Sequence, residues 1–378
     1  MTNITKKTLN FILSFICLVS FSACQTTTKN AEKLPMIMEI AVLLPMSGPN
    51  SATGHQYNEL IKMGLEDGSK THINVTTYDG SDEAHALEAM DKIIKRGTKI
   101  ILGPLYSPIT SQIANKAKNH GIIVITMSNN PALADSKLFV FGHAPLKQLA
   151  LIINYFLNND YKNFIALLPA GEHSVQSNKI IQDMVIKGNA TLVRSEFYLN
   201  LPESINKSVK LVSDSVDNLN EIEDSMTKPV IYLSDDPKNL NLIFNSIHKY
   251  NLDKKAIIAG DNRIDIEYPE NIDIIFSGSL NFLNSDISDR AKKFGINHMS
   301  FMHLIAYDLG RMTASFIGDE PDLEQFLARI NSKVPYIGVS GNIRFIDSIA
   351  QREYDIIKRE NGEYTTISPS PRSKLLPQ

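Results

Sequence analysis

The sequence predicts an α/β fold, in which parallel sheets are covered by helices on both faces. Three observations predict it: short apolar runs alternate with amphipathic stretches, each run ends in a polar or glycine-containing loop, and the whole pattern restarts after residue 143. Alternation of this kind is typical of parallel sheets buried on both sides. The composition, 43% hydrophobic and 21% charged, is that of a globular protein with a packed core.

The first half of the pattern begins with an apolar run that ends at Pro45. Strands are expected at 38–44, 73–77, 99–102, 122–126 and 138–141. Helices are expected at 55–66, 82–96 and 107–117. Gly97 ends the second helix, and Ser107 followed by Pro108 is typical of a helix cap and first turn.

A second parallel sheet is expected within residues 144–280. Its strands are predicted at 163–168, 191–198, 230–233, 256–259 and 272–276. Its helices are predicted at 145–157, 178–187 and 240–250, with a weak helical period over 204–226. As in the first half, the strands end in polar loops, so each sheet has one rim of polar side chains.

The remaining residues follow a different pattern. Two helices are expected at 301–316 and 323–330, then an extended segment at 338–345 and an edge strand at 352–358. The Ser-Pro repeats near the end predict a disordered tail over 367–378.

The first residues resemble a secretory signal peptide, which is removed from the mature protein. Lys6 and Lys7 precede an apolar stretch at 9–21 that is short for a membrane span, and small residues then lead to Cys24. Ser22-Ala23-Cys24 resembles a bacterial lipobox, which predicts a signal peptide over 1–23 and a lipid on Cys24. An ordinary signal peptide that contains a cysteine is the alternative.

Cysteine usage favours the lipidated form. The chain has two cysteines, and Cys17 lies within the segment to be removed. The mature chain then keeps Cys24 alone, so an internal disulfide is excluded. Residues 24–37 are polar and predict a flexible tether. By resemblance to Gram-negative lipoproteins, Gln25 after the lipidated residue implies the outer membrane, on its periplasmic face.

Several motifs together resemble one known family. They are LLPMSG from Leu43, ILGPLYS from Ile101, SNN from Ser128, AYD from Ala306 and GVSGNIRF from Gly338. The chain resembles type I periplasmic binding proteins, and within them the penicillin-binding protein activators, which are outer-membrane lipoproteins that stimulate a peptidoglycan synthase. Better-known activators carry a helical-repeat domain before this module, where this chain has a short tether.

The resemblance implies two lobes, each a parallel sheet flanked by helices, with a cleft between them. Lobe one is expected at 38–143 plus 281–334, and lobe two at 144–280 plus 335–366.

Candidate ligand-binding residues are the polar side chains at the strand ends. Related amino-acid binders hold ligands with hydroxyl and backbone N–H groups at such loops, and a helix start favours anions. The candidates are Ser47, Ser107, Thr126, Ser128 and Asn129 in lobe one, and Asp235 and Asp261 in lobe two. Each has a plainer alternative: Ser107 as a helix cap, Ser128 and Asn129 as turn residues, and the two aspartates as solvent-facing loop residues.

Other function classes lack a signature. A net charge of −3 argues against nucleic acid as a partner. No G-x-S-x-G, phosphate-binding loop, dinucleotide motif or H-E-x-x-H is present, so we expect no enzyme activity, no cofactor and no metal.

Two hypotheses remain open. The first is a lipoprotein that regulates a peptidoglycan synthase by contact in cell-wall synthesis. The second is a receptor that binds an amino acid or small polar ligand for an ABC importer.

Overall fold

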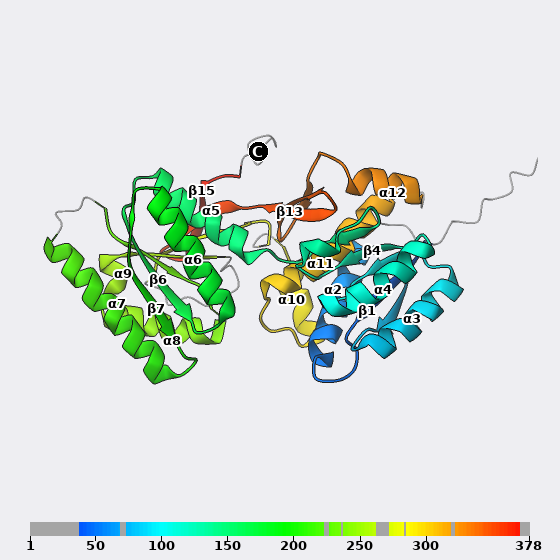
Figure 1. Ribbon diagram of the computed structural model, residues 1–378, viewed down its shortest axis with the longest axis horizontal. Helices are drawn as coiled ribbons and strands as arrows, with labels where there is room; N and C mark the ends of the chain where they lie inside the picture. Colours follow the sequence, from blue (N-terminus) through cyan, green and yellow to red (C-terminus); the bar gives the residue numbers. More distant parts are fainter. Residues whose placement is uncertain are drawn as a thin grey trace, which may run out of the picture. The chain divides into compact units, whose positions relative to one another are not determined.

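The computed structural model describes residues 38–68, 73–222, 227–235, 237–261, 272–282, 285–318 and 322–370. Within them the chain forms two lobes, each a mostly parallel sheet flanked by helices (Figure 1), which confirms the predicted fold class. The expected signal peptide, Cys24 and the tether fall on residues 1–37, outside the described residues, as do residues 371–378. Among the described helices, none is long and apolar enough to cross a bilayer.

The first sheet has five parallel strands in the order β2-β1-β3-β4-β5. They are β1 (Met38–Leu44), β2 (Ile73–Asp79), β3 (Ile100–Leu102), β4 (Ile123–Thr126) and β5 (Leu138–Val140). In β1, Val42 and Leu44 pack into the core on one face, and Ala41 and Leu43 into the core on the other. Because both faces are buried, the strand is apolar throughout rather than alternating.

Helices cover both faces of this first sheet (Figure 1). The core on one face includes α2 (Ser51–Gly68) and α11 (Phe301–Ile317), and that on the other includes α3 (Glu83–Arg96) and α4 (Ser107–Asn119). Local signals fix the ends of α3: Asp82 accepts a hydrogen bond from the His85 N–H, and Gly97 adopts a left-handed φ of 78°. The smaller elements are η1 (Pro131–Leu133), α10 (Ile287–Ala291), η2 (Lys292–Phe294) and α12 (Leu323–Ile330).

Helices α2 and α11 pack through glycines. A Cβ on Gly64 would overlap the carbonyl oxygen of Tyr307, and one on Gly310 would overlap the carbonyl oxygen of Ile61. The missing side chains therefore allow the two backbones to approach closely. Arg290 in α10 adds a two-pronged ion pair to Asp67 at the end of α2, with N–O distances of 2.7 and 2.9 Å.

The second sheet repeats the same parallel order, β7-β6-β8-β9-β10. Its strands are β6 (Asn163–Pro169), β7 (Thr191–Tyr198), β8 (Val230–Leu233), β9 (Ile257–Asp261) and β10 (Ile274–Gly278). The core on one face includes α5 (Pro145–Asn158) and α6 (Glu172–Lys187); that on the other includes α7 (Pro202–Ile222), α8 (Pro237–Lys249) and α9 (Leu252–Lys255).

The end of the chain corrects one predicted boundary. Strands β11 (Tyr336–Gly338), β12 (Gly341–Ile346) and β13 (Ile349–Glu353) extend the first sheet, although residues 335–366 were expected in lobe two. Asp347 and Ser348, with φ of 50° and 59°, form the β12–β13 turn. Strand β13 then pairs with β5, which keeps this hairpin on the first sheet.

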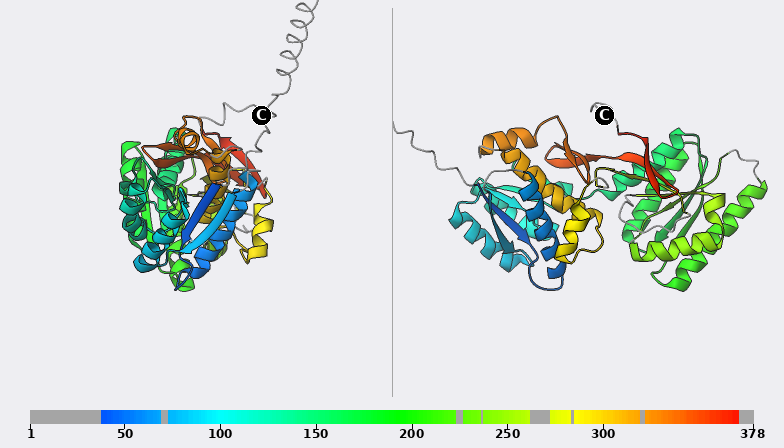
Figure 2. Two further views of the ribbon diagram at one scale, coloured as in Figure 1. Left: turned by 90° about the vertical axis from the view of Figure 1, so that its right-hand side faces the viewer. Right: turned by 180° about the vertical axis from the view of Figure 1, so that it is seen from behind.

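Only Tyr354 separates β13 from β14 (Asp355–Glu360), so the expected single strand at 352–358 is in fact the passage between the sheets (Figure 2). Strands β14 and β15 (Glu363–Ser368) form an antiparallel hairpin on the second sheet. The expected tail therefore begins too early, because residues 367 and 368 belong to β15.

Candidate functional site at the carboxyl ends of the strands

Each sheet has a point at which its strand order reverses. In open α/β sheets ligands bind outside the carboxyl ends of the strands at such a point. In the first sheet it lies between β1 and β3, and in the second between β6 and β8. The loops that follow these strands contain Ser47, Tyr106 and Asp235, and Ser107 begins α4 directly after the β3 loop.

The loops after β3 and β4 meet through two serine hydroxyls. Ser107 Oγ and Ser128 Oγ are 2.6 Å apart. Ser128 is 3% exposed, and its Oγ also accepts the Asn130 N–H at 3.1 Å. The structure thus brings these two predicted residues together, and their hydroxyls bond to each other.

Thr126 is fully buried beneath this serine pair. Its hydroxyl donates to the Pro104 carbonyl at 2.8 Å and lies 2.8 Å from Thr110 Oγ1. It also accepts the Ser128 N–H at 3.1 Å. These contacts hold the two loops together. Asn129, the next candidate, is exposed.

Ser47 lies apart from this group, in the exposed loop after β1. Its hydroxyl is 2.9 Å from Ser81 Oγ. Below the loop, the Asp79 carboxylate accepts the Met46 and Ser81 N–H groups, each at 2.9 Å. Burial alone would raise the pKa of Asp79, but hydrogen bonds from Ser47, Met46 and Ser81 outweigh it and lower that pKa. A retained negative charge here disfavours an anionic ligand beside Ser47.

In the second lobe, the Asp235 carboxylate is hydrogen-bonded to residues of the same lobe. It accepts the hydroxyl of the fully buried Tyr198 at 2.7 Å and the Asn239 amide at 3.2 Å. Asp261 ends β9, where it pairs in register with Ser277 of β10. The Asp261 side chain lies outside what the structure describes.

The start of α4 differs from the prediction. Ser107 was expected to cap this helix; instead Tyr106 occupies the cap position without a side-chain hydrogen bond, and Ser107 is the first helical residue. The first N–H groups of a helix have no intrahelical partner, and such a start attracts anions. Tyr106 is 37% exposed beside it.

Asp308, Ser340 and Arg352 form a buried hydrogen-bond network that the sequence did not predict. The Asp308 carboxylate, fully buried in α11, accepts the Val339 and Ser340 N–H groups at 3.0 and 2.7 Å, and also the Ser340 hydroxyl. A Cβ on Gly338 would overlap this carboxylate, which accounts for the glycine. The sequence signal that could have indicated this network is the pair of motifs that contain Asp308 and Gly338–Gly341, which were used only for their resemblance to a known family.

This network also joins the segments by which the chain passes between lobes. Arg352 donates to Ser340 Oγ at 3.3 Å and to the carbonyls of Phe141 and Gly142 at 2.7 and 2.8 Å, and its guanidinium lies over the Phe141 ring. The Asn281 amide donates to the Gly338 carbonyl at 3.0 Å. The segment after β10 is therefore bonded directly to the turn at 338–341, and Arg352 of β13 connects the segment after β5 to the same turn.

His143 follows the first of these segments. Its ring lies 4.4 Å from that of Phe301, edge to face, and its Nδ1 is buried without a hydrogen-bond partner in the described part of the chain. Burial, then the charges of Arg352 and His173, lower the pKa of His143 to about 3. The imidazole is therefore neutral at neutral pH.

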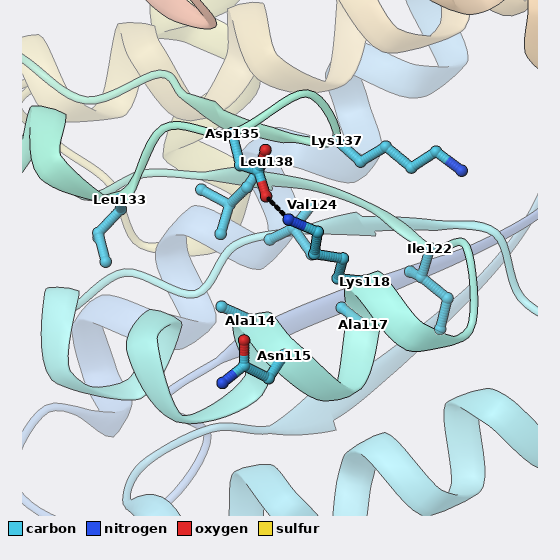
Figure 3. A pocket seen from close by; sticks show the side chains of 10 residues that line it. All are labelled: Ala114, Asn115, Ala117, Lys118, Ile122, Val124, Leu133, Asp135, Lys137 and Leu138. Atoms are coloured by element: carbon cyan, nitrogen blue, oxygen red, sulfur yellow. Dashed lines mark hydrogen bonds and ion pairs between the residues drawn. The ribbon is translucent and has the colours of Figure 1, made fainter.

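A small pocket lies away from all of these residues (Figure 3). Its volume is about 90 Å³, and it lies between α4 and the segment that leads into β5. Lys118 and Asp135 form an ion pair of 2.6 Å among its lining residues, which also include Val124 and Leu138. It contains none of the predicted site residues.

Comparison with known proteins identifies relatives for this fold. A family model described as "Periplasmic binding protein" matches residues 38–204. An uncharacterised protein of Rickettsia prowazekii (strain Madrid E) is 58% identical over 372 residues, 97% of this chain and 100% of that protein.

Two solved structures show the same likeness. One is a putative branched-chain amino acid ABC transporter from Rhodospirillum rubrum, with TM-score 0.68, 12% identity, and coverage of 88% of this chain and 100% of that one. The other is the C-domain of LpoA (YraM) from Haemophilus influenzae, a regulator of PBP1A, with TM-score 0.61, 18% identity, and coverage of 87% of this chain and 99% of that one. At these identities the structural likeness concerns the fold.

Proposed function

We propose that this chain, whose residues 38–204 match the periplasmic binding protein family model, is a non-enzymatic periplasmic lipoprotein that regulates a peptidoglycan synthase by direct contact. A lipid on Cys24 anchors it to the periplasmic face of the outer membrane. The tether at 24–37 then gives the folded lobes reach toward the synthase.

One observation carries this proposal: the described polar groups at the strand ends are largely engaged within their own lobes. Thr126 and Ser128 hold neighbouring loops together, and Asp235 is bonded to Tyr198 and Asn239. A ligand would have to replace these internal hydrogen bonds, and leaving a buried donor or acceptor unmatched costs about 1–3 kcal/mol. Contact through the protein surface needs no such exchange.

The comparison with LpoA supports the same proposal. That protein is a regulator of PBP1A, and its C-domain is covered over 99% of its length. LpoA therefore combines a similar fold with regulation of PBP1A. The internal hydrogen bonds at the strand ends are the reason to prefer regulation by contact over ligand binding for this chain.

The test is a binding measurement with a purified bifunctional penicillin-binding protein from the same cell. The full-length protein, purified in detergent, is immobilised and the synthase is passed over it, with an unrelated lipoprotein as the control surface. We expect saturable binding to this protein alone. Signals equal to the control across the concentration range would refute the proposal.

A receptor for a small polar ligand is the second candidate, and the start of α4 favours it. Ser107 lies there beside helix N–H groups that lack a side-chain cap. Native mass spectrometry of the full-length protein, purified from its own cell in detergent, distinguishes the two functions. A stoichiometric retained ligand, lost on denaturation, would support the receptor.

A further inference from the structure

Four large apolar side chains are exposed at the carboxyl end of β7. Val175, Phe197, Leu199 and Leu201 are 61%, 40%, 59% and 57% exposed. Single exposed apolar residues are ordinary, but a contiguous group marks an interaction surface. We call these four residues the β7-end patch.

The patch comes from two neighbouring connections. The Ala170 N–H donates to the Tyr198 carbonyl at 2.7 Å, so the start of α6 lies beside the end of β7. Val175 is in the first turn of α6, where its N–H donates to the Gly171 carbonyl at 3.1 Å. Strand β7 is the last strand on this side of its sheet, so no further strand covers this edge in the described part of the chain.

The loop that carries the two leucines is held by its own hydrogen bonds. The Leu199 N–H donates to Ser204 Oγ at 2.9 Å, and the Leu201 N–H donates to the Leu199 carbonyl at 2.7 Å. The Ile205 N–H then donates to the Leu201 carbonyl at 3.0 Å as α7 begins. An ordered surface loses less conformational entropy when a partner binds, which favours affinity.

The charges in the two helix turns nearest the patch are negative. Glu172 and Glu203 are exposed in the first turns of α6 and α7, next to Val175 and Leu201. Arg194 is paired with Glu196 at 2.7 Å. The exposed Lys179 and Lys207 lie further along α6 and α7, beyond the first turns that contain Glu172 and Glu203. Complementary charge guides encounter and orients partners, so the fitting surface has basic residues around an apolar centre.

We propose that the β7-end patch is the docking surface for the protein partner, and that it takes a segment with apolar side chains flanked by lysine or arginine. This inference rests on the proposed function and assigns it to one surface. The leucines form the apolar centre of the contact, where a few residues carry most of the binding energy, and the glutamates form its charged rim.

The experiment measures synthase binding by the full-length protein and three variants in detergent. The first is Leu199→Ser with Leu201→Ser, and the second is Glu172→Lys with Glu203→Lys. The matched control is Ile186→Ser with Val334→Ser, at apolar residues that are 63% and 75% exposed elsewhere on the surface. All six positions are exposed, so each variant should keep the native unfolding temperature.

We expect dissociation constants at least about 10-fold weaker for the leucine and glutamate variants, and within about 2-fold of the parent for the control. Unchanged binding by both patch variants would overturn the docking surface and leave the proposed function standing. If the unmodified protein does not bind the synthase, both the docking surface and the proposed function would be overturned. Sedimentation that shows a dimer of the parent and a monomer of the leucine variant would assign the patch to a second copy of this chain and overturn the partner named here.

Discussion

Asp308 shows how one buried carboxylate fixes the turn on which the passages between lobes converge. It accepts two backbone N–H groups and a hydroxyl, and Ser340 passes the connection on to Arg352. Burial raises the pKa of Asp308. The hydrogen bonds that the carboxylate accepts oppose the effect of its burial.

Replacing Asp308 with alanine should destabilise the protein by about 3 kcal/mol, because two buried N–H groups lose their acceptor. Chemical denaturation measures this. Asp91→Ala is the matched control, since Asp91 makes an exposed ion pair with Lys116 and such pairs contribute about 0–1 kcal/mol. Equal losses in the two variants would contradict the role given to Asp308.

His143 predicts a loss of stability in acid. Its pKa is about 3 in the folded chain and about 6.5 when unfolded, so between these values the unfolded chain binds the extra proton. Stability is therefore greatest above pH 7 and falls as the pH drops through 6.5 toward 3. From pH 7 to 5 the native protein should lose on the order of 2 kcal/mol more than His143→Asn. Denaturation curves at several pH values test this, and parallel pH dependence in the two proteins would contradict it.

For single residues, the sequence predicted where the candidate side chains lie better than it predicted which groups they hydrogen-bond. Ser107, Thr126 and Ser128 were expected in one region because parallel strands end at one edge, and they do meet there. Their mutual hydrogen bonds depend on side-chain directions that spacing does not reveal. Arg352 was predicted only as part of an edge strand. Its contact with Gly142, 210 residues away in the chain, could not be predicted from the local sequence pattern.

Among the elements, the α2–α11 pair depends most closely on side-chain size. Gly64→Ala and Gly310→Ala should each destabilise the protein by about 1–3 kcal/mol or more, because the added methyl meets backbone that cannot move freely. Gly171→Ala is the control, since a Cβ there has no heavy atom within 4 Å. Urea denaturation compares the three, and a neutral Gly310→Ala would show that these helices can separate.

The sequence predicted which segments form helices and strands, but it assigned one hairpin to the wrong sheet. The buried strands are short apolar runs between turn residues, and 191–198 and 230–233 match β7 and β8 at both ends. Residues 336–353 were placed in the wrong lobe. A hairpin has the same local pattern on either sheet, and only the pairing of β13 with β5 decides between them.

For the whole molecule, the proposed membrane anchor depends on a lipid at Cys24. We expect labelled fatty acid on the native protein and recovery in the outer-membrane fraction, because two or more acyl chains hold a protein stably on a bilayer. Cys24→Ser should be unlabelled and should leave that fraction. Equal labelling of the two proteins would place the lipid elsewhere, and no label on either would favour an ordinary signal peptide.

The central claim is that the folded lobes act on a synthase by contact. The most direct measurement is the rate of glycan polymerisation by the purified synthase, with and without a saturating amount of this protein. We expect a severalfold rise with the native protein and little or none with Leu199→Ser plus Leu201→Ser. A rate that the native protein leaves unchanged would contradict it.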